Sequence, residues 1–178
     1  MKHYISIIIL AIFLFSCNGH SKHWETLSQI ESYIEEKPDS ALVTLEQIDL
    51  SELSGKEEKA KYALLYSMAL DKNFIDKTDF EVLQPAIDYY ENNGSATDKL
   101  RTYYYQGRIY QNAGNDAFAM GSFVKAISEG EASEDVLTKA RIYFAQSKIY
   151  YSLCEWDNFI ESNISAASHF QDAGAYNC

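Results

Sequence analysis

The chain has 178 residues and carries 26 acidic against 15 basic side chains, which gives a formal net charge of −11. This acidic balance argues against nucleic acid as a partner, because phosphate neutralisation needs clustered Lys and Arg. Hydrophobic residues make up 47% of the chain and aromatic residues 14%, so it can bury a core and is not expected to be disordered. Two prolines and eight glycines leave too little turn chemistry for a many-stranded β-sandwich.

The first residues of the chain predict a secretory signal. Lys2 and His3 precede an apolar stretch over residues 5–15 that is interrupted only by Ser6. This stretch is too short to cross the hydrocarbon core of a bilayer, which takes about 20 residues. It has the length of the apolar region of a signal peptide.

The residues Leu14, Phe15, Ser16 and Cys17 resemble the lipobox of bacterial lipoproteins. There, a small residue precedes a cysteine that is acylated, for example with palmitate, and becomes the new N-terminus. The resemblance implies a signal peptide over 1–16, a lipidated tether over 17–23 and lipid attachment at Cys17. It also implies a bacterial envelope protein anchored at the periplasmic face, since several acyl chains hold a protein far more firmly than one. The alternative is an ordinary signal peptide, or a short anchor, with an incidental cysteine.

Two cysteines remain, Cys154 and Cys178. In an oxidising envelope they can form a disulfide, and the alternative is one half-buried thiol and one thiol at the chain terminus. The sequence has no CxxC motif and no Cys/His cluster, so we predict no metal site.

Internal repetition is the strongest signal in the sequence. When the chain is shifted by forty residues, three copies align in residue type. The aligned positions are Lys59, Lys99 and Lys139; Ala60, Leu100 and Ala140; Lys61, Arg101 and Arg141; Ser67, Gly107 and Ser147; Leu70, Tyr110 and Tyr150; and Ala86, Ala126 and Ala166.

Each copy contains two stretches in which apolar residues follow the three-and-four spacing of an amphipathic helix. With one more pair upstream, the expected helices cover residues 24–34 and 41–48, 62–70 and 80–90, 100–111 and 118–127, and 142–153 and 156–170. Gly114 suits a helix C-terminus, and Asn115 or Asp116 suits the cap of the next helix. Pro38 suits a helix start, where its missing N–H donor is not needed.

These patterns predict an all-α fold of stacked helix pairs, because one pair cannot bury its apolar face but several can. We expect small residues at the points where two helices cross closely, since a large side chain would push them apart. On the first helices these are Ser67, Gly107 and Ser147, and on the second helices they face Ala86, Ala126 and Ala166.

The middle copy resembles the tetratricopeptide repeat through Tyr103, Gln106, Gly107, Tyr110, Ala119 and Phe123, with a period of forty in place of about 34. The resemblance covers residues 24–174 and implies a right-handed α-solenoid of about four antiparallel helix pairs, with the repeat domain over 24–178. Together with the lipobox, the chain resembles tetratricopeptide-repeat lipoproteins of bacterial envelopes. Residues 38–42 and 63–65 resemble the N-terminal repeat region of longer regulators of this type.

In this family the first helices line a concave groove that binds peptides or protein segments. Carried over by register, the resemblance implies a groove lined by Lys61, Arg101, Tyr104, Arg108, Gln111, Asn112, Arg141, Phe144, Lys148 and Tyr151. All three arginines of the chain fall in this set, and guanidinium groups bind carboxylates in a bidentate manner. The expected ligand is therefore an acidic or carboxylate-ended peptide of a protein partner. Two alternatives stay open: the cations pair with acids on neighbouring helices, and Tyr104 and Phe144 belong to the core between pairs.

The sequence predicts no catalytic residue and no cofactor. It contains no HExxH, phosphate-binding loop, dinucleotide fingerprint or nucleophile elbow. Adjacent acids such as Glu35 and Glu36 fit a solvated helix face.

We therefore expect a membrane-anchored adaptor that binds a protein segment in the groove. The main alternative is a sensory segment of a tetratricopeptide-type membrane regulator without its effector domain. A third is an accessory subunit or a sugar-binding protein with a Tyr-lined groove. The last expected helix carries Phe159, Ile160, Ile164 and Phe170. Either its exposed face binds a second copy or a partner, or the chain is a shortened form of a longer one.

Overall fold

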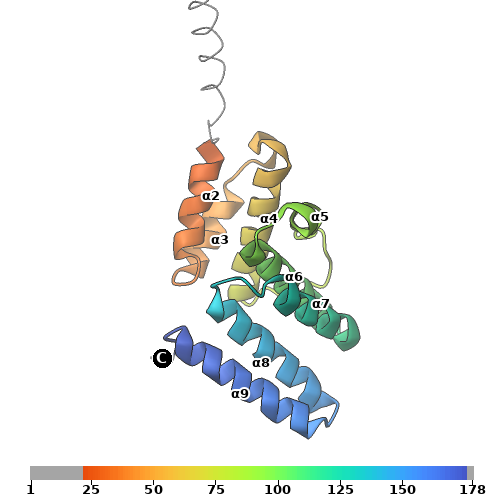
Figure 1. Cartoon of the computed structure of the whole chain (residues 1–178). Helices are drawn as coiled ribbons and strands as arrows, with labels where there is room; N and C mark the ends of the chain where they lie inside the picture. Colours follow the sequence, from red (N-terminus) through yellow and green to blue (C-terminus); the bar gives the residue numbers. More distant parts are fainter. Residues whose placement is uncertain (1–21, 176–178) are drawn as a thin grey trace, which may run out of the picture.

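The computed structural model describes residues 22–175, and every regular element in that range is helical (Figure 1). The prediction of an all-α fold is confirmed for this part of the chain. The elements are α2 (Lys22–Tyr33), α3 (Pro38–Glu46), the 3-10 helix η1 (Leu50–Glu52), α4 (Gly55–Lys72), α5 (Gln84–Asn93), α6 (Ala96–Asn112), α7 (Asp116–Glu129), α8 (Val136–Ser152) and α9 (Trp156–Asp172). The expected signal peptide, Cys17 and Cys178 lie outside the described residues.

From α4 onward consecutive helices pack in pairs, whereas α3 packs more on α4 than on α2. Helix α6 packs on α7 and α8 on α9 over most of their lengths, and α4 makes a smaller contact with α5. The first helices of successive pairs also contact one another, α2 with α4, α4 with α6 and α6 with α8. In Figure 1 the pairs follow one another along the molecule, from α2 and α3 to α8 and α9.

Local signals in the sequence account for several helix ends. Pro38 occupies the first turn of α3. Gly114 follows α6 with a φ of 73°, a left-handed conformation that glycine adopts without strain. The side chain of Asn115 accepts a hydrogen bond from the backbone N–H of Phe118 and so caps α7. Forty residues apart, Ser95 and Asp135 cap α6 and α8 in the same way.

The second helix of the first copy begins later than its apolar pattern predicts. We expected it to include Phe80, but α5 begins at Gln84 and residues 73–83 form turns and loop. Pro85 lies in the first turn of α5. Inside a longer helix this proline would remove one backbone hydrogen bond and clash with the preceding turn, at a cost of about 3 kcal/mol, so the helix begins just before it.

The close approach of α6 and α7 depends on Gly107. A Cβ atom added to Gly107 would lie 2.3 Å from Cε1 of Phe123, and its three nearest atoms all belong to that ring. The expected partner was Ala126; it is buried, but the aromatic ring faces the glycine instead. In the next pair the equivalent residues also approach each other, with Ser147 Oγ 3.4 Å from Asn163 Oδ1.

We expect Gly107→Ala to lower the free energy of unfolding by about 1–3 kcal/mol, because the methyl group and the Phe123 ring cannot share the same space. Urea denaturation followed by circular dichroism at 222 nm measures the change. Gly121→Ala is the matched control, since Gly121 lies in α7 with no atom within 4 Å of the added Cβ. The control should be neutral or stabilising by up to about 1 kcal/mol. Equal stability of Gly107→Ala and the wild type would contradict the close crossing.

Candidate binding surface

The predicted groove residues come from three first helices, but they differ in whether they are exposed or paired with acidic side chains. Lys61 lies on α4, five residues from Arg101 to Asn112 lie on α6, and Arg141 to Tyr151 lie on α8. Four cations of the set form ion pairs with acidic side chains, and we call them the paired set: Lys61, Arg101, Arg108 and Arg141. Three residues in the second half of α8, from its middle onward, are exposed, and we call them the exposed α8 set: Phe144, Lys148 and Tyr151.

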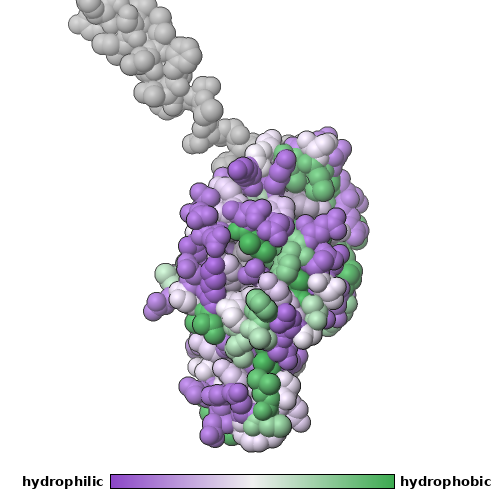
Figure 2. All heavy atoms as spheres, turned by 90° about the vertical axis from the view of Figure 1, so that its right-hand side faces the viewer, coloured by the Kyte–Doolittle hydropathy of each residue, from purple (hydrophilic) through white to green (hydrophobic). Residues whose placement is uncertain are grey.

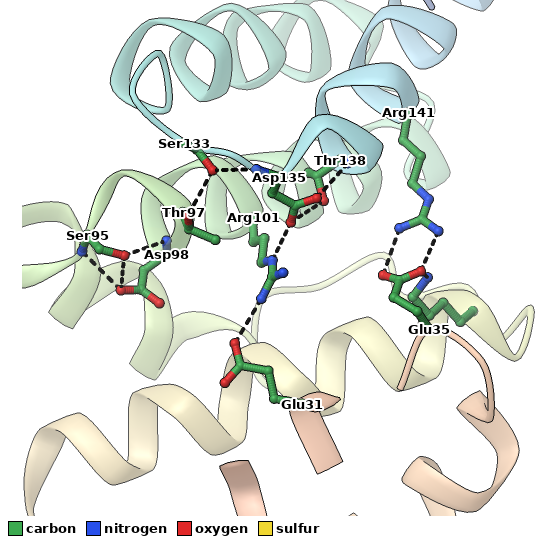
Figure 3. A network of polar contacts seen from close by, with 11 residues as sticks. Glu31, Glu35, Ser95, Thr97, Asp98, Arg101, Ser133, Asp135, Thr138 and Arg141 are labelled. Carbon is green, nitrogen blue, oxygen red and sulfur yellow. Dashed lines mark hydrogen bonds and ion pairs between the residues drawn. The ribbon is translucent and has the colours of Figure 1, made fainter. Parts of the chain in front are cut away.

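Arg101 joins three segments of the chain. Its Nε atom donates to Asp135 Oδ2 at 2.6 Å and its Nη1 atom donates to Glu31 Oε1 at 2.9 Å, so the guanidinium lies between the two acids (Figure 3). Glu31 also accepts a hydrogen bond of 2.5 Å from Lys61 Nζ. The carboxylate of Asp135 further accepts bonds from the backbone and side chain of Thr138. Burial raises the pKa of Asp135, but the charge of Arg101 and these hydrogen bonds outweigh that effect and hold the pKa below its usual value.

Arg141 reaches across the helix stack to Glu35, which is 106 residues away in the sequence. Its Nη1 and Nη2 atoms donate to the two carboxylate oxygens at 2.9 and 2.6 Å (Figure 3). Lys72 Nζ donates to the same carboxylate at 2.6 Å. Burial opposes ionisation of Glu35, but the bonds and charges of Arg141 and Lys72 prevail and lower its pKa to about 2. Glu35 is exposed, as expected for a solvated face, but it forms ion pairs with Arg141 and Lys72.

The remaining polar groove residues on α6 also have partners within the chain. Arg108 Nε donates to Asp71 Oδ1 at 3.0 Å, and Arg108 Nη1 donates to Gln111 Oε1 at 2.6 Å. Asn112 Nδ2 donates to the backbone carbonyl of Lys77 at 3.3 Å. The guanidinium forks that the sequence assigned to a ligand carboxylate are thus already bonded to carboxylates and an amide of the protein itself.

The aromatic members of the predicted groove differ in exposure. Tyr104 is 6% exposed and packs against Tyr105 and Phe123, so it belongs to the core between the pairs. Phe144, its equivalent forty residues later, is 44% exposed. Lys148 Nζ lies 4.6 Å from the centroid of the Phe144 ring, a cation–π contact.

Around Tyr151 the exposed α8 set continues onto α9. The Tyr151 ring contacts the rings of Trp156 and Phe159, with centroids 5.7 and 5.6 Å apart. Ile160 and Ile164 follow Trp156 at four-residue intervals on α9 and are exposed. Together these side chains form an apolar and aromatic surface that no described helix covers.

Sequence reasoning missed Glu31 and Glu35 as partners of Arg101 and Arg141. Glu31 lies in the last turn of α2, and Glu35, four residues later, lies in the turn that follows the helix. That spacing was the available signal, but it does not show which cations lie opposite. Within residues 22–175 no group of acids, histidines and cysteines is arranged to hold a metal ion, and no helix is long and apolar enough to span a membrane. Cys154 is an exposed free thiol.

We expect Glu35→Gln to lower the free energy of unfolding at pH 7 by about 1–2 kcal/mol, because it removes the ion pairs with Arg141 and Lys72. The loss is no larger because the Glu35 side chain is 35% exposed and solvent screens these pairs. The difference between wild type and variant should shrink as the pH falls from 4.5 towards 2. In that window the unfolded state binds the proton more readily than the folded state, so acid removes the stabilisation. Urea titrations at intervals from pH 7 to pH 2 measure it.

The control for this titration is Glu36→Gln, an exposed neighbour for which a change within about 0.5 kcal/mol is expected. A difference between wild type and Glu35→Gln that stays constant from pH 5 to pH 2 would contradict the role of the Glu35 carboxylate.

Comparison with known proteins gives no relative: no family model, no curated protein and no solved structure matches the chain.

Proposed function

We propose that the protein is a lipid-anchored helical-repeat adaptor of a bacterial envelope, which binds a segment of another protein. The observation that carries the proposal is the exposed α8 set. Within this set, Phe144 is 44% exposed, whereas Leu64 and Tyr104, its equivalents eighty and forty residues earlier, are 4% and 6% exposed. A bulky apolar position that is buried in two copies and open in the third, where it is aromatic, has the composition of a protein interface.

The scaffold of this proposal is a right-handed α-solenoid of antiparallel pairs. Three findings support it: the forty-residue register, the packing of consecutive helices in pairs and the successive contacts among first helices. In repeat proteins of this kind, each unit contacts its neighbours and the stack presents an extended binding surface.

Binding is proposed for the exposed α8 set rather than for the paired set. A partner carboxylate at Arg101 or Arg141 would have to displace Glu31 or Glu35. Breaking such a pair leaves a partly buried charge without a partner, which is unfavourable. Phe144 and Tyr151 require no such exchange, and Lys148 supplies a positive charge beside them.

The proposed anchor depends on the sequence alone, because residues 1–21 lie outside the described part of the chain. Cys17 follows a signal-like apolar stretch and a small residue. Acylation there would hold the repeat domain within a few residues of the membrane surface, since α2 begins at Lys22.

Site-specific photo-crosslinking tests the binding surface. The photoreactive residue p-benzoylphenylalanine replaces Phe144 or Tyr151 in the full chain, produced in its host cells. In the matched control the photoreactive residue replaces Phe74. This residue is 92% exposed but lies in the loop after α4. We expect one discrete protein adduct from positions 144 and 151 and none from position 74. An adduct of two copies would make self-association the function of this surface, and identical patterns at all three positions would contradict the proposal.

The anchor has its own test. In Triton X-114 partition, the wild type should enter the detergent phase and Cys17→Ala should stay in the aqueous phase or remain as the uncleaved precursor, because acyl chains provide the membrane affinity. Mass spectrometry of the mature N-terminal peptide identifies the acylated cysteine. A Cys17→Ala protein that is processed normally and still enters the detergent phase would refute lipidation at this residue.

A further inference from the structure

A groove runs beside α4 on the side of α5, away from the predicted binding residues. It consists of two adjoining hollows of about 450 and 510 Å³ that share Lys59 and Pro85. We call it the lateral groove. Figure 2 views the side on which α5 lies in Figure 1 and shows apolar areas there between hydrophilic side chains. Each hollow has a volume typical of ligand pockets.

The two hollows differ in chemistry. The first is lined mainly by apolar and tyrosine side chains: Leu50, Leu53, Tyr62, Ala63, Tyr66, Val82 and Pro85, with Glu81 as its acid. The rings of Tyr62 and Tyr66 are 5.6 Å apart, and Leu50 at its edge is 56% exposed. The second hollow is lined mostly by residues with polar groups: Lys56, Lys59, Asp88, Tyr89 and Asn93 beside Pro85. Its acid, Asp88, accepts a hydrogen bond from Gln84.

Lys59 lacks a partner that its register equivalents have. Lys99 Nζ donates to Glu129 Oε2 at 2.9 Å. Lys139 Nζ donates to the backbone carbonyls of Glu131 and Ser133 at 2.9 and 2.7 Å. The residue forty positions before Glu129 is Tyr89, which offers no carboxylate.

Lys56 and Lys59 make no ion pair with any residue in the described range 22–175, although acids outnumber bases in this protein. They are exposed and three residues apart on α4, so both face the same side of the helix. Two unpaired ammonium groups beside an apolar hollow are complementary to a ligand that joins an apolar group to a carboxylate.

We propose that the lateral groove binds an unstructured segment of a partner protein in which a bulky apolar side chain lies within a few residues of Asp or Glu. The apolar side chain enters the hollow between Leu50, Tyr62 and Tyr66. The carboxylate lies against Lys59 and Lys56. The site shares no residue with the exposed α8 set, so the outcome for one binding proposal does not decide the outcome for the other.

Selection from a phage-displayed library of random twelve-residue peptides, with the purified full chain as bait, tests the proposal. We expect the enriched peptides to combine an apolar residue with nearby Asp or Glu. Their affinity is then measured by fluorescence polarisation. The double variant Lys56→Glu/Lys59→Glu and the variant Leu50→Asp should each raise Kd at least tenfold.

Matched controls separate the groove from general effects of charge. Lys37→Glu changes an exposed lysine that does not line the groove, and Val43→Asp changes an exposed apolar residue of α3. Both should leave Kd within twofold. The tested charge reversals should not unfold the protein, because Lys56 lies in the first turn of α4, where an acid is favoured. Unchanged far-ultraviolet circular dichroism verifies this.

A charge swap gives the decisive outcome. Peptides whose Asp and Glu are replaced by Lys should bind the double variant better than the wild type, and the original peptides should show the reverse. Failure to enrich any peptide, enrichment of basic peptides, or an equal loss of affinity in the control variants would overturn the proposal. Binding to phosphatidylglycerol vesicles that the same variants abolish, with no peptide selected, would assign the groove to a membrane surface and would overturn it too.

Discussion

One pair of short helices cannot bury all of its apolar surface, so further helices must pack on it. The contacts of α2 with α4, α4 with α6 and α6 with α8 meet this requirement. They bury Tyr104, Tyr105 and Ile109 of α6 between neighbouring elements. The stack also needs close crossings within the pairs, and Gly107 against Phe123 provides one of them. The positions of all polar groups discussed above follow from this packing.

Stacking brings together charges that are far apart in the sequence. Arg101 meets Glu31 across 70 residues and Arg141 meets Glu35 across 106. Partly buried arginines are costly without partners, and bidentate carboxylates satisfy them well. The first ion pair joins α2 to α6, and the second joins the turn between α2 and α3 to α8. The basic surface inferred from α4, α6 and α8 is therefore neutralised by acids of neighbouring first helices and of the turn after α2.

Both proposed binding surfaces arise where the repeat pattern is not completed. Phe144 is 44% exposed, whereas its register equivalents Leu64 and Tyr104 are buried. Lys59 remains unpaired because Tyr89 stands where the next copy has Glu129. In a periodic protein such departures are informative, because regular positions are already satisfied by neighbouring units. The repeat thus supplies a scaffold, and its irregular positions supply the surfaces that are open to a partner.

The sequence by itself determined the features that depend on neighbours within one or two turns. The helix identities, the forty-residue register, the proline start at Pro38 and the end of α6 at Gly114 were all predictable, because local spacing and backbone conformation control them. Only the tertiary structure decided that Phe123 faces Gly107, that Tyr104 is buried while Phe144 is exposed, and that Glu35 pairs with Arg141. These contacts depend on the angles between successive pairs, which add up along the stack. Small differences in side-chain packing set those angles. The residue pattern of a single helix therefore does not predict the accumulated angle between distant pairs.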